Sequence, residues 1–309
     1  MKTVAVVGCG VIGSSWATYY LAKGFDVTAT DPAPGAEERL RKMISEFWPA
    51  AERGGLGQGA ARERLTFEKD AGRAVRKADF IQENGPERIA IKRELIAQLD
   101  GAAPIGTLIA TSSSGILASE IQDAAKHPER VLVGHPFNPP HLIPLVEVVG
   151  GKLTSDQAIQ RAMAFYTAIG KKPIHIRREM KGHVANRLQA ALWREAFYLV
   201  TQGVVSVAEI DAAIANGPGL RWAILGPLLN LHLSGGDAGI RHFLEHLGPP
   251  IENWWRDLGN ISITPQVIEA LVNGVNAELE PFDLSRMTEQ RDDVLLSLLE
   301  LKRRHHQLP

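Results

Sequence analysis

Several features that often identify a function are scarce or missing in these 309 residues. Cys9 is the single cysteine, which excludes a disulfide within the chain and is typical of a reducing cytoplasm. No apolar run approaches the length of a membrane span, and a formal net charge of −1 favours neither nucleic acid nor an anionic membrane as a partner. We therefore predict a cytoplasmic protein without nucleic-acid or membrane partners, long enough for two domains.

The N-terminal segment joins an apolar strand, residues 4–7, to the glycine pattern Gly-x-Gly-x-x-Gly and then to a helix. Phosphate groups bind well at such a helix N-terminus, where free N–H groups and the helix dipole both favour anions. Asp31 lies eighteen residues past the last glycine, where it can accept hydrogen bonds from ribose hydroxyls and repel a 2′-phosphate. The segment thus predicts an NAD site rather than an NADP site. Its predicted cofactor-binding residues are Gly8, Gly10, Val11, Ile12, Gly13 and Asp31.

Short apolar runs alternate with helical segments through the first half of the chain, a pattern typical of a parallel sheet with helices on both faces. A helical excursion over about 36–74, interrupted by the glycine-rich turn 53–59, separates the second and third of these strands. The expected strands are 4–7, 27–30, 80–83, 108–111, 131–134, 145–149 and 172–176.

The second half changes character. Apolar residues follow helical spacing from Asn186, and Ser206 with Glu209 forms a capping box that starts another helix. No convincing strand follows as far as Leu301. We predict an α/β domain over 1–180, a Rossmann-type doubly wound and mostly parallel sheet, followed by an all-α domain over 181–309.

A histidine and a glutamate provide the candidate chemistry. His135 follows the strand 131–134 at the sheet edge that faces the ligand crevice in open α/β folds. Glu147 lies twelve residues later inside an apolar run, where a buried carboxylate is costly unless it is paired. Pairing with Glu147 would fix the tautomer of His135 and raise its basicity, as a general base requires. The alternative is a turn histidine and an unrelated glutamate on an edge strand.

Three motifs resemble the 3-hydroxyacyl-CoA dehydrogenase superfamily across nearly the whole chain: the segment 135–148, the serine-rich loop 111–115 and the segment 182–188. The resemblance implies that His135 is a general base oriented by Glu147. It also implies that Ser114 and Asn186 hold the substrate oxygen, with Asn138 supporting the site. Glu87, Lys92 and Ser114 fall where the family contacts its cofactor, and we predict no metal site.

The chain departs from the acyl-CoA members of that superfamily. Pro136 follows the histidine where those members commonly have an aromatic residue, and residues 37–64 contain a single lysine. The segments 134–139, 219–222 and 226–228 resemble the branch with lambda-crystallin, L-gulonate 3-dehydrogenase and L-carnitine 3-dehydrogenase. We predict a small 3-hydroxy acid as substrate, with L-carnitine favoured, L-gulonate next and an acyl-CoA after it. A structural, crystallin-like protein that binds NAD is the non-enzymatic alternative.

A trimethylammonium substrate is recognised by aromatic faces, and its carboxylate suits an arginine. The same aromatic residues could instead be core or dimer contacts, and the arginine a structural ion pair. The family also implies a homodimer through the helical domain. The predicted substrate-binding residues are Phe137, Trp193, Phe197, Arg221 and Trp222.

Overall fold

The computed structural model describes residues 1–305 and 308, and the chain divides into two compact units, Met1–Arg187 and Leu188–Pro309. The first unit is an eight-stranded sheet in the order β3-β2-β1-β4-β5-β6-β7-β8. Its strands are β1 (Thr3–Val7), β2 (Asp26–Thr30), β3 (Leu65–Phe67), β4 (Phe80–Glu83), β5 (Leu108–Thr111), β6 (Val131–Pro136), β7 (Leu145–Gly150) and β8 (Lys172–Ile176).

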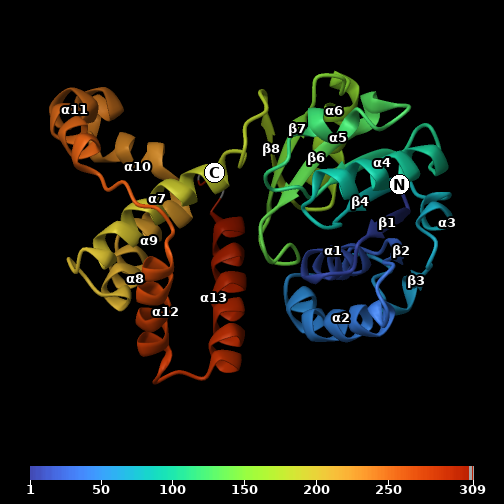
Figure 1. Ribbon diagram of the computed structural model, residues 1–309, viewed down its shortest axis with the longest axis horizontal. Helices are drawn as coiled ribbons and strands as arrows, with labels where there is room; N and C mark the ends of the chain where they lie inside the picture. The colour runs from blue at the N-terminus through green and yellow to red at the C-terminus, as the bar shows by residue number, and fades with distance from the viewer. Residues whose placement is uncertain (306–307, 309) are drawn as a thin grey trace. The chain divides into compact units, whose positions relative to one another are not determined.

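Neighbouring strands are parallel except β6 and β7, which are antiparallel. Helices cover both faces of the sheet because successive side chains of its strands point to opposite sides and both faces carry buried apolar residues (Figure 1). The helices on one face are α1 (Val11–Ala22), α2 (Ala36–Arg53) and α6 (Asp156–Ala168); on the other they are α3 (Ala71–Val75), α4 (Ile89–Ala102) and α5 (Ala118–Gln122). The predicted doubly wound, mostly parallel fold is confirmed.

The two faces have different cores. The α1 face buries stacked aromatic rings, with Trp16 5.1 Å from Tyr20 and Phe80 4.1 Å from Phe165 between ring centroids. The α4 face is aliphatic and includes Ile81, Ile96 and Leu99. Large rigid rings on one face and branched side chains on the other clamp the sheet from both sides, so its C-terminal strand ends form a stable platform.

The region between β2 and β4 differs from the prediction of a purely helical excursion. Helix α2 ends at Arg53 and glycines follow, as expected, but Leu65–Phe67 then forms β3 beside β2. A three-residue edge strand has too few residues to show strand periodicity, which explains why the sequence pattern missed it.

The second unit is helical throughout its described residues. Ser206 and Glu209 form the predicted capping box, and α7 is followed by Gly203 in a left-handed conformation (φ 69°). In the described part of the chain, no helix combines the length and apolar character that crossing a membrane requires. The helices of the second unit are α7 (Ala185–Thr201), which begins in the first unit, then α8 (Val207–Asn216), α9 (Pro218–Leu225), α10 (Pro227–Ser234), α11 (Gly239–Asp257), α12 (Pro265–Leu279) and α13 (Leu284–Arg304).

Candidate active site

His135 and Glu147 lie opposite each other on the antiparallel strands β6 and β7. His135 Nδ1 is 2.8 Å from Glu147 Oε2, and both side chains are buried. His135 lies inside β6 rather than just beyond it, because pairing with β7 extends the strand past the last residue paired to β5. Directly opposed residues share a face of the sheet, so the register alone brings the imidazole and the carboxylate together.

The second oxygen of Glu147 is held by the start of α7. The amides of Val184 and Ala185 donate to Glu147 Oε1 at 3.0 and 2.9 Å. Burial by itself would raise the pKa of Glu147, but the hydrogen bonds from His135 and from these two amides lower it below its ordinary value of 4.5. The carboxylate is therefore ionised at neutral pH and has a hydrogen bond on each oxygen.

An ionised Glu147 determines the tautomer of His135. A carboxylate only accepts hydrogen bonds, so the proton of a neutral imidazole lies on Nδ1 and Nε2 carries the free lone pair. The ring of Phe137 packs edge-on against the imidazole, with 5.5 Å between ring centroids. The imidazole thus has a fixed orientation and a single basic nitrogen.

The serine-rich loop after β5 is organised by Glu87. Glu87 Oε1 accepts from Ser113 Oγ at 2.7 Å and from the amides of Ser114, Gly115 and Ile116 at 2.9–3.2 Å. These hydrogen bonds outweigh the effect of burial and lower the pKa of Glu87. Ser114 remains exposed at the tip of the loop.

Lys92 lies beneath this loop. It is 1% exposed, and its ammonium donates to both oxygens of Glu83, to the Gly85 carbonyl and to Thr111 Oγ1. Four acceptors for three N–H groups leave no donor for a ligand. The described contacts of Lys92 are therefore those of a support for the loop.

His183 is a residue that the sequence analysis missed. It is 1% exposed, and its Nε2 lies 3.0 Å from the Ser113 carbonyl oxygen. Its φ of 50° is the one positive value among the described non-glycine residues. Burial lowers the pKa of His183, although the hydrogen bond to Ser113 opposes that shift. The neutral ring links the serine loop to the turn whose amides bind Glu147, a role that no spacing rule could reveal.

The glycine turn forms the expected cradle. Gly8 has a φ of 88°, and a Cβ on Gly13 would come within 1.8 Å of the Gly8 carbonyl oxygen, so neither position accepts a side chain. Gly10 faces open space, and α1 starts immediately after it with Val11 and Ile12. Asp31 fixes the turn by accepting the Cys9 amide at 2.7 Å. An open helix N-terminus beside a carboxylate fits a dinucleotide.

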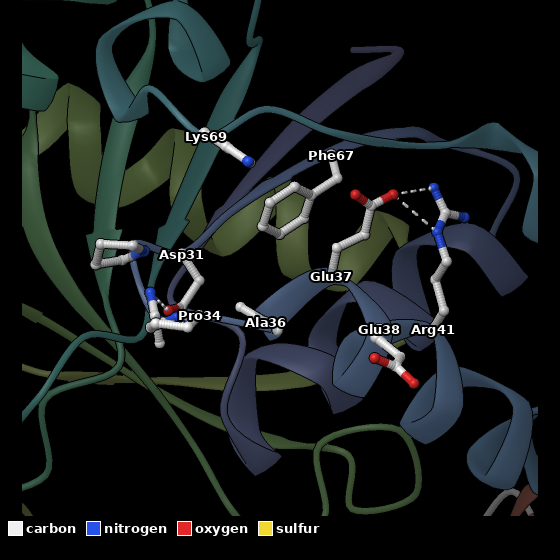
Figure 2. Close-up of a pocket in the computed structure, with 11 residues that line it drawn as sticks. Asp31, Pro34, Ala36, Glu37, Glu38, Arg41, Phe67 and Lys69 are labelled. Atoms are coloured by element: carbon white, nitrogen blue, oxygen red, sulfur yellow. Dashed lines mark hydrogen bonds and ion pairs between the residues drawn. The ribbon is translucent and has the colours of Figure 1, made fainter.

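A hollow of about 770 Å³ continues from Asp31 along the start of α2. Figure 2 shows Glu37, Phe67 and Lys69 around it, with Arg41 hydrogen-bonded to Glu37. The sequence analysis did not identify this wall, because Phe67 and Lys69 come from the unrecognised strand β3 and the residues after it. The hollow offers carboxylates and an aromatic ring next to the cradle.

The remaining candidates have fewer described contacts. Asn138 is exposed, and Asn186 is the second residue of α7, directly after the amides that bind Glu147. The predicted substrate-binding residues of the second unit lie on two helices, Trp193 and Phe197 on α7 and Arg221 and Trp222 on α9. In residues 1–305 and 308, no group of three or more His, Cys, Asp or Glu side chains could hold a metal ion.

Comparison with known proteins identifies the family. Residues 3–180 match the NAD binding domain of 3-hydroxyacyl-CoA dehydrogenase, and residues 182–287 match its C-terminal domain. The chain belongs to the 3-hydroxyacyl-CoA dehydrogenase family. It is an NAD-dependent oxidoreductase.

Two L-carnitine dehydrogenases match this chain along nearly their whole length. The L-carnitine dehydrogenases of Bacillus cereus and Pseudomonas aeruginosa are each 47% identical to it, covering 97% and 99% of this chain and 92% and 96% of their own. Among solved structures, the NAD+-dependent dismutase 5-formyl-3-hydroxy-2-methylpyridine 4-carboxylic acid 5-dehydrogenase superposes with a TM-score of 0.84 at 28% identity, covering 98% and 99% of the two chains. The 3-hydroxybutyryl-CoA dehydrogenase of Escherichia coli K12 has a TM-score of 0.64 at 30% identity, over 80% of this chain and 53% of that one.

Proposed function

We propose that the protein oxidises the 3-hydroxyl group of L-carnitine to the 3-oxo acid with NAD, and that His135 is the general base. The observation that carries the chemistry is the buried 2.8 Å hydrogen bond between His135 Nδ1 and Glu147 Oε2. The substrate is supported by the relatives, since L-carnitine dehydrogenases match nearly the full chain at 47% identity.

Oxidation of a secondary alcohol removes a proton from oxygen and a hydride from carbon. NAD, when bound, supplies the hydride acceptor. His135 Nε2 takes the hydroxyl proton, and the resulting imidazolium is stabilised by the ionised Glu147 at Nδ1. The amides of Val184 and Ala185 keep that carboxylate from rotating away. Each residue thus acts from a position that its hydrogen bonds fix before substrate arrives.

Neutral donors complete the proposed site. Ser114 and Asn186 hold the substrate oxygen, whose charge changes during the reaction, and Asn138 supports them. Ser114 has its backbone fixed by Glu87, and Asn186 follows the helix start that Glu147 fixes. Glu87 and Lys92 then act on the cofactor indirectly, through the hydrogen bonds by which they hold this loop.

NAD is proposed over NADP. Asp31 and Glu37 place two carboxylates beside the cradle, where a 2′-phosphate would be repelled. Arg41 is hydrogen-bonded to Glu37 and does not offer a free charge, although Lys69 also lines the hollow. The ribose hydroxyls of NAD can donate to the same carboxylates.

The cationic end of carnitine needs aromatic faces. We propose Phe137 for this role together with Trp193, Phe197 and Trp222, and Arg221 for the substrate carboxylate. These five residues supply rings and one guanidinium, the chemistry that a zwitterion of this kind requires.

A substrate panel tests the proposal. Purified protein with NAD should form NADH with L-carnitine far faster than with L-gulonate, 3-hydroxybutyrate or 3-hydroxybutyryl-CoA. Turnover with the CoA ester alone would refute L-carnitine as the substrate. Turnover with L-gulonate alone would identify that sugar acid as the substrate instead. NAD binding without NADH formation on any compound would favour the crystallin-like role.

We also propose a homodimer formed through the helical unit, in the cytoplasm. Among its described residues, Val207 and Val267 are the large apolar side chains buried below a tenth of their surface, while Leu229, Leu233 and Trp255 are at least 46% exposed. Exposed apolar area on this scale is typical of a protein–protein interface, and a second copy is the occupant that the family implies.

A further inference from the structure

The segment 137–144, which joins β6 to β7, carries Phe137 and Asn138 two and three residues after His135. Two of its backbone carbonyls are bound by one side chain, Lys171. The ammonium donates to the carbonyl oxygen of Ile143 at 3.0 Å and to that of Pro140. Lys171 comes just before β8 and is 3% exposed, so its charge lies inside the first unit.

The surroundings of this charge are unusual. The ammonium lies 3.9 Å from the ring centroid of Tyr19 and 5.0 Å from that of Trp16, both on α1. Burial, and to a smaller extent the like charge of Lys23, lowers the pKa of Lys171 well below 10.5, with no carboxylate among the causes. Carbonyl dipoles and ring faces are its compensation, and burying a cation without an acid is expensive. An apolar side chain would serve stability as well.

Helix α1 holds the same segment a second time. The His141 amide donates to Ser15 Oγ at 2.9 Å, and Ser15 Oγ lies 2.8 Å from His141 Nδ1, so the serine can return its proton to the ring. Ser15, Trp16 and Tyr19 all lie on α1, the helix that begins at the glycine cradle. The segment beside the proposed base is therefore bonded to α1 directly at His141, and at Pro140 and Ile143 to Lys171, whose ammonium lies against two rings of the same helix.

We propose that Lys171 is a positioning residue for the reaction, which holds the segment 137–144 against α1 and so fixes Phe137 and Asn138 beside His135. This inference rests on the proposed function for its kinetic consequence. Its structural part, the anchoring of the segment, is independent of the substrate. Burying the Lys171 ammonium costs stability, and its role in positioning the segment explains why a lysine is present there.

The test replaces Lys171 by methionine, which keeps the length and removes the charge and the donors. Lys171→Met should lower kcat for L-carnitine at least tenfold while KM and the affinity for NADH, followed by fluorescence, change less than threefold. The amides of Leu142 and Ile143, both bonded to the Pro139 carbonyl, should exchange hydrogen at least tenfold faster. Thermal unfolding should change little, because removing a buried charge offsets the loss of a donor for the two carbonyls.

Lys172→Met is the matched control. It removes the same charge from the next, exposed position and should leave kcat, exchange and unfolding within twofold of the wild type. If Lys171→Met does not fold, Lys171→Gln keeps one donor group and should show a smaller fall in kcat together with a smaller increase in exchange at the same two amides.

Three results would overturn the inference. One is wild-type kcat and wild-type exchange at Leu142 and Ile143 in the methionine variant. The second is faster exchange throughout the sheet with an equal loss of thermal stability, and the third is that both Lys171 variants fail to fold, because a general structural role gives those two outcomes. Failure of the wild type to oxidise L-carnitine would count against the proposed function alone, since the exchange measurement still tests the anchor.

Discussion

The two units of this chain bury their apolar residues very differently. In Met1–Arg187 the sheet has helices on both faces, and side chains such as Trp16, Phe80 and Leu108 are fully buried. In the described part of Leu188–Pro309, helices α7, α9, α10 and α13 contain no buried residue at all. The first unit buries its apolar side chains in its own core, whereas the second unit leaves many apolar side chains of its amphipathic helices exposed.

The difference has an energetic meaning. Burying a leucine-sized side chain contributes about 1.5–3 kcal/mol, and a domain is only marginally stable overall. The second unit buries so few large side chains that its own apolar contacts contribute little to its stability. The hydrogen-bonded pair His135–Glu147 lies in the unit with the complete core, where the strands that carry it are fixed from both faces.

The largest expected effect concerns chemistry in the first unit. His135→Ala should lower kcat by about 10³-fold or more, since a positioned base contributes about 10²–10⁴-fold, and should leave NADH affinity nearly intact. Steady-state kinetics and fluorescence titration measure the two. His175→Ala removes an exposed histidine from β8 and should keep wild-type turnover. An active His135→Ala enzyme would remove His135 from the role of base.

Glu147→Gln should lower kcat by about 100-fold, because an amide can no longer stabilise the imidazolium. Adding Glu147→Gln to His135→Ala should cost little more, since the two residues act as a unit. Additive losses in the double variant would show that they act separately.

The same glutamate gives a pH dependence of stability. Its pKa is lower in the folded protein than the ordinary 4.5, so its stabilising contribution is complete above that value. It is lost as the pH falls from about 4.5 through the folded pKa. Urea midpoints measured across this range should fall less steeply in Glu147→Gln than in the wild type, and equal slopes would contradict the shift.

Coenzyme selection should show a smaller effect. Asp31→Ser should weaken NAD binding by about tenfold, as expected for losing a hydrogen bond to a charged group, and narrow the preference over NADP. Asp26→Ser, at the opposite end of β2, is the control and should change neither affinity. An unchanged ratio of kcat/KM for the two coenzymes would exclude Asp31 from selection.

The smallest effect on turnover is expected in the second unit. Leu229 and Leu233 lie one turn apart on an exposed face of α10, and replacing both by aspartate should favour monomers in sedimentation velocity. The kcat per folded chain should stay within about threefold, since the hydrogen-bonded pair His135–Glu147 lies in the first unit. Leu153→Asp, an equally exposed site in the first unit, should leave the sedimentation unchanged. Identical sedimentation of both variants would contradict an interface at α10.

Much of the fold was predictable because it repeats a periodic signal. The strands that end in Glu83, Thr111 and Ile176 are short runs of four or five residues with apolar positions, bounded by turns, and the sequence located them closely. The edge strand β3 was missed since three residues carry no period. The position of Glu147 inside an apolar run also predicted that it needs a partner, which the antiparallel register then supplies.

The sequence alone indicated the family through the resemblance of three motifs and predicted the dinucleotide cradle through local spacing. The cost of burying a charge predicted that Glu147 needs a partner. Tertiary structure decided what joins them. His183 reaches Ser113 across 70 positions, and Lys171 meets carbonyls about 30 residues away, through backbone turns that no short pattern encodes. Contacts of that kind arise only when distant segments pack together, so the chain specifies them through its whole fold rather than through any one motif.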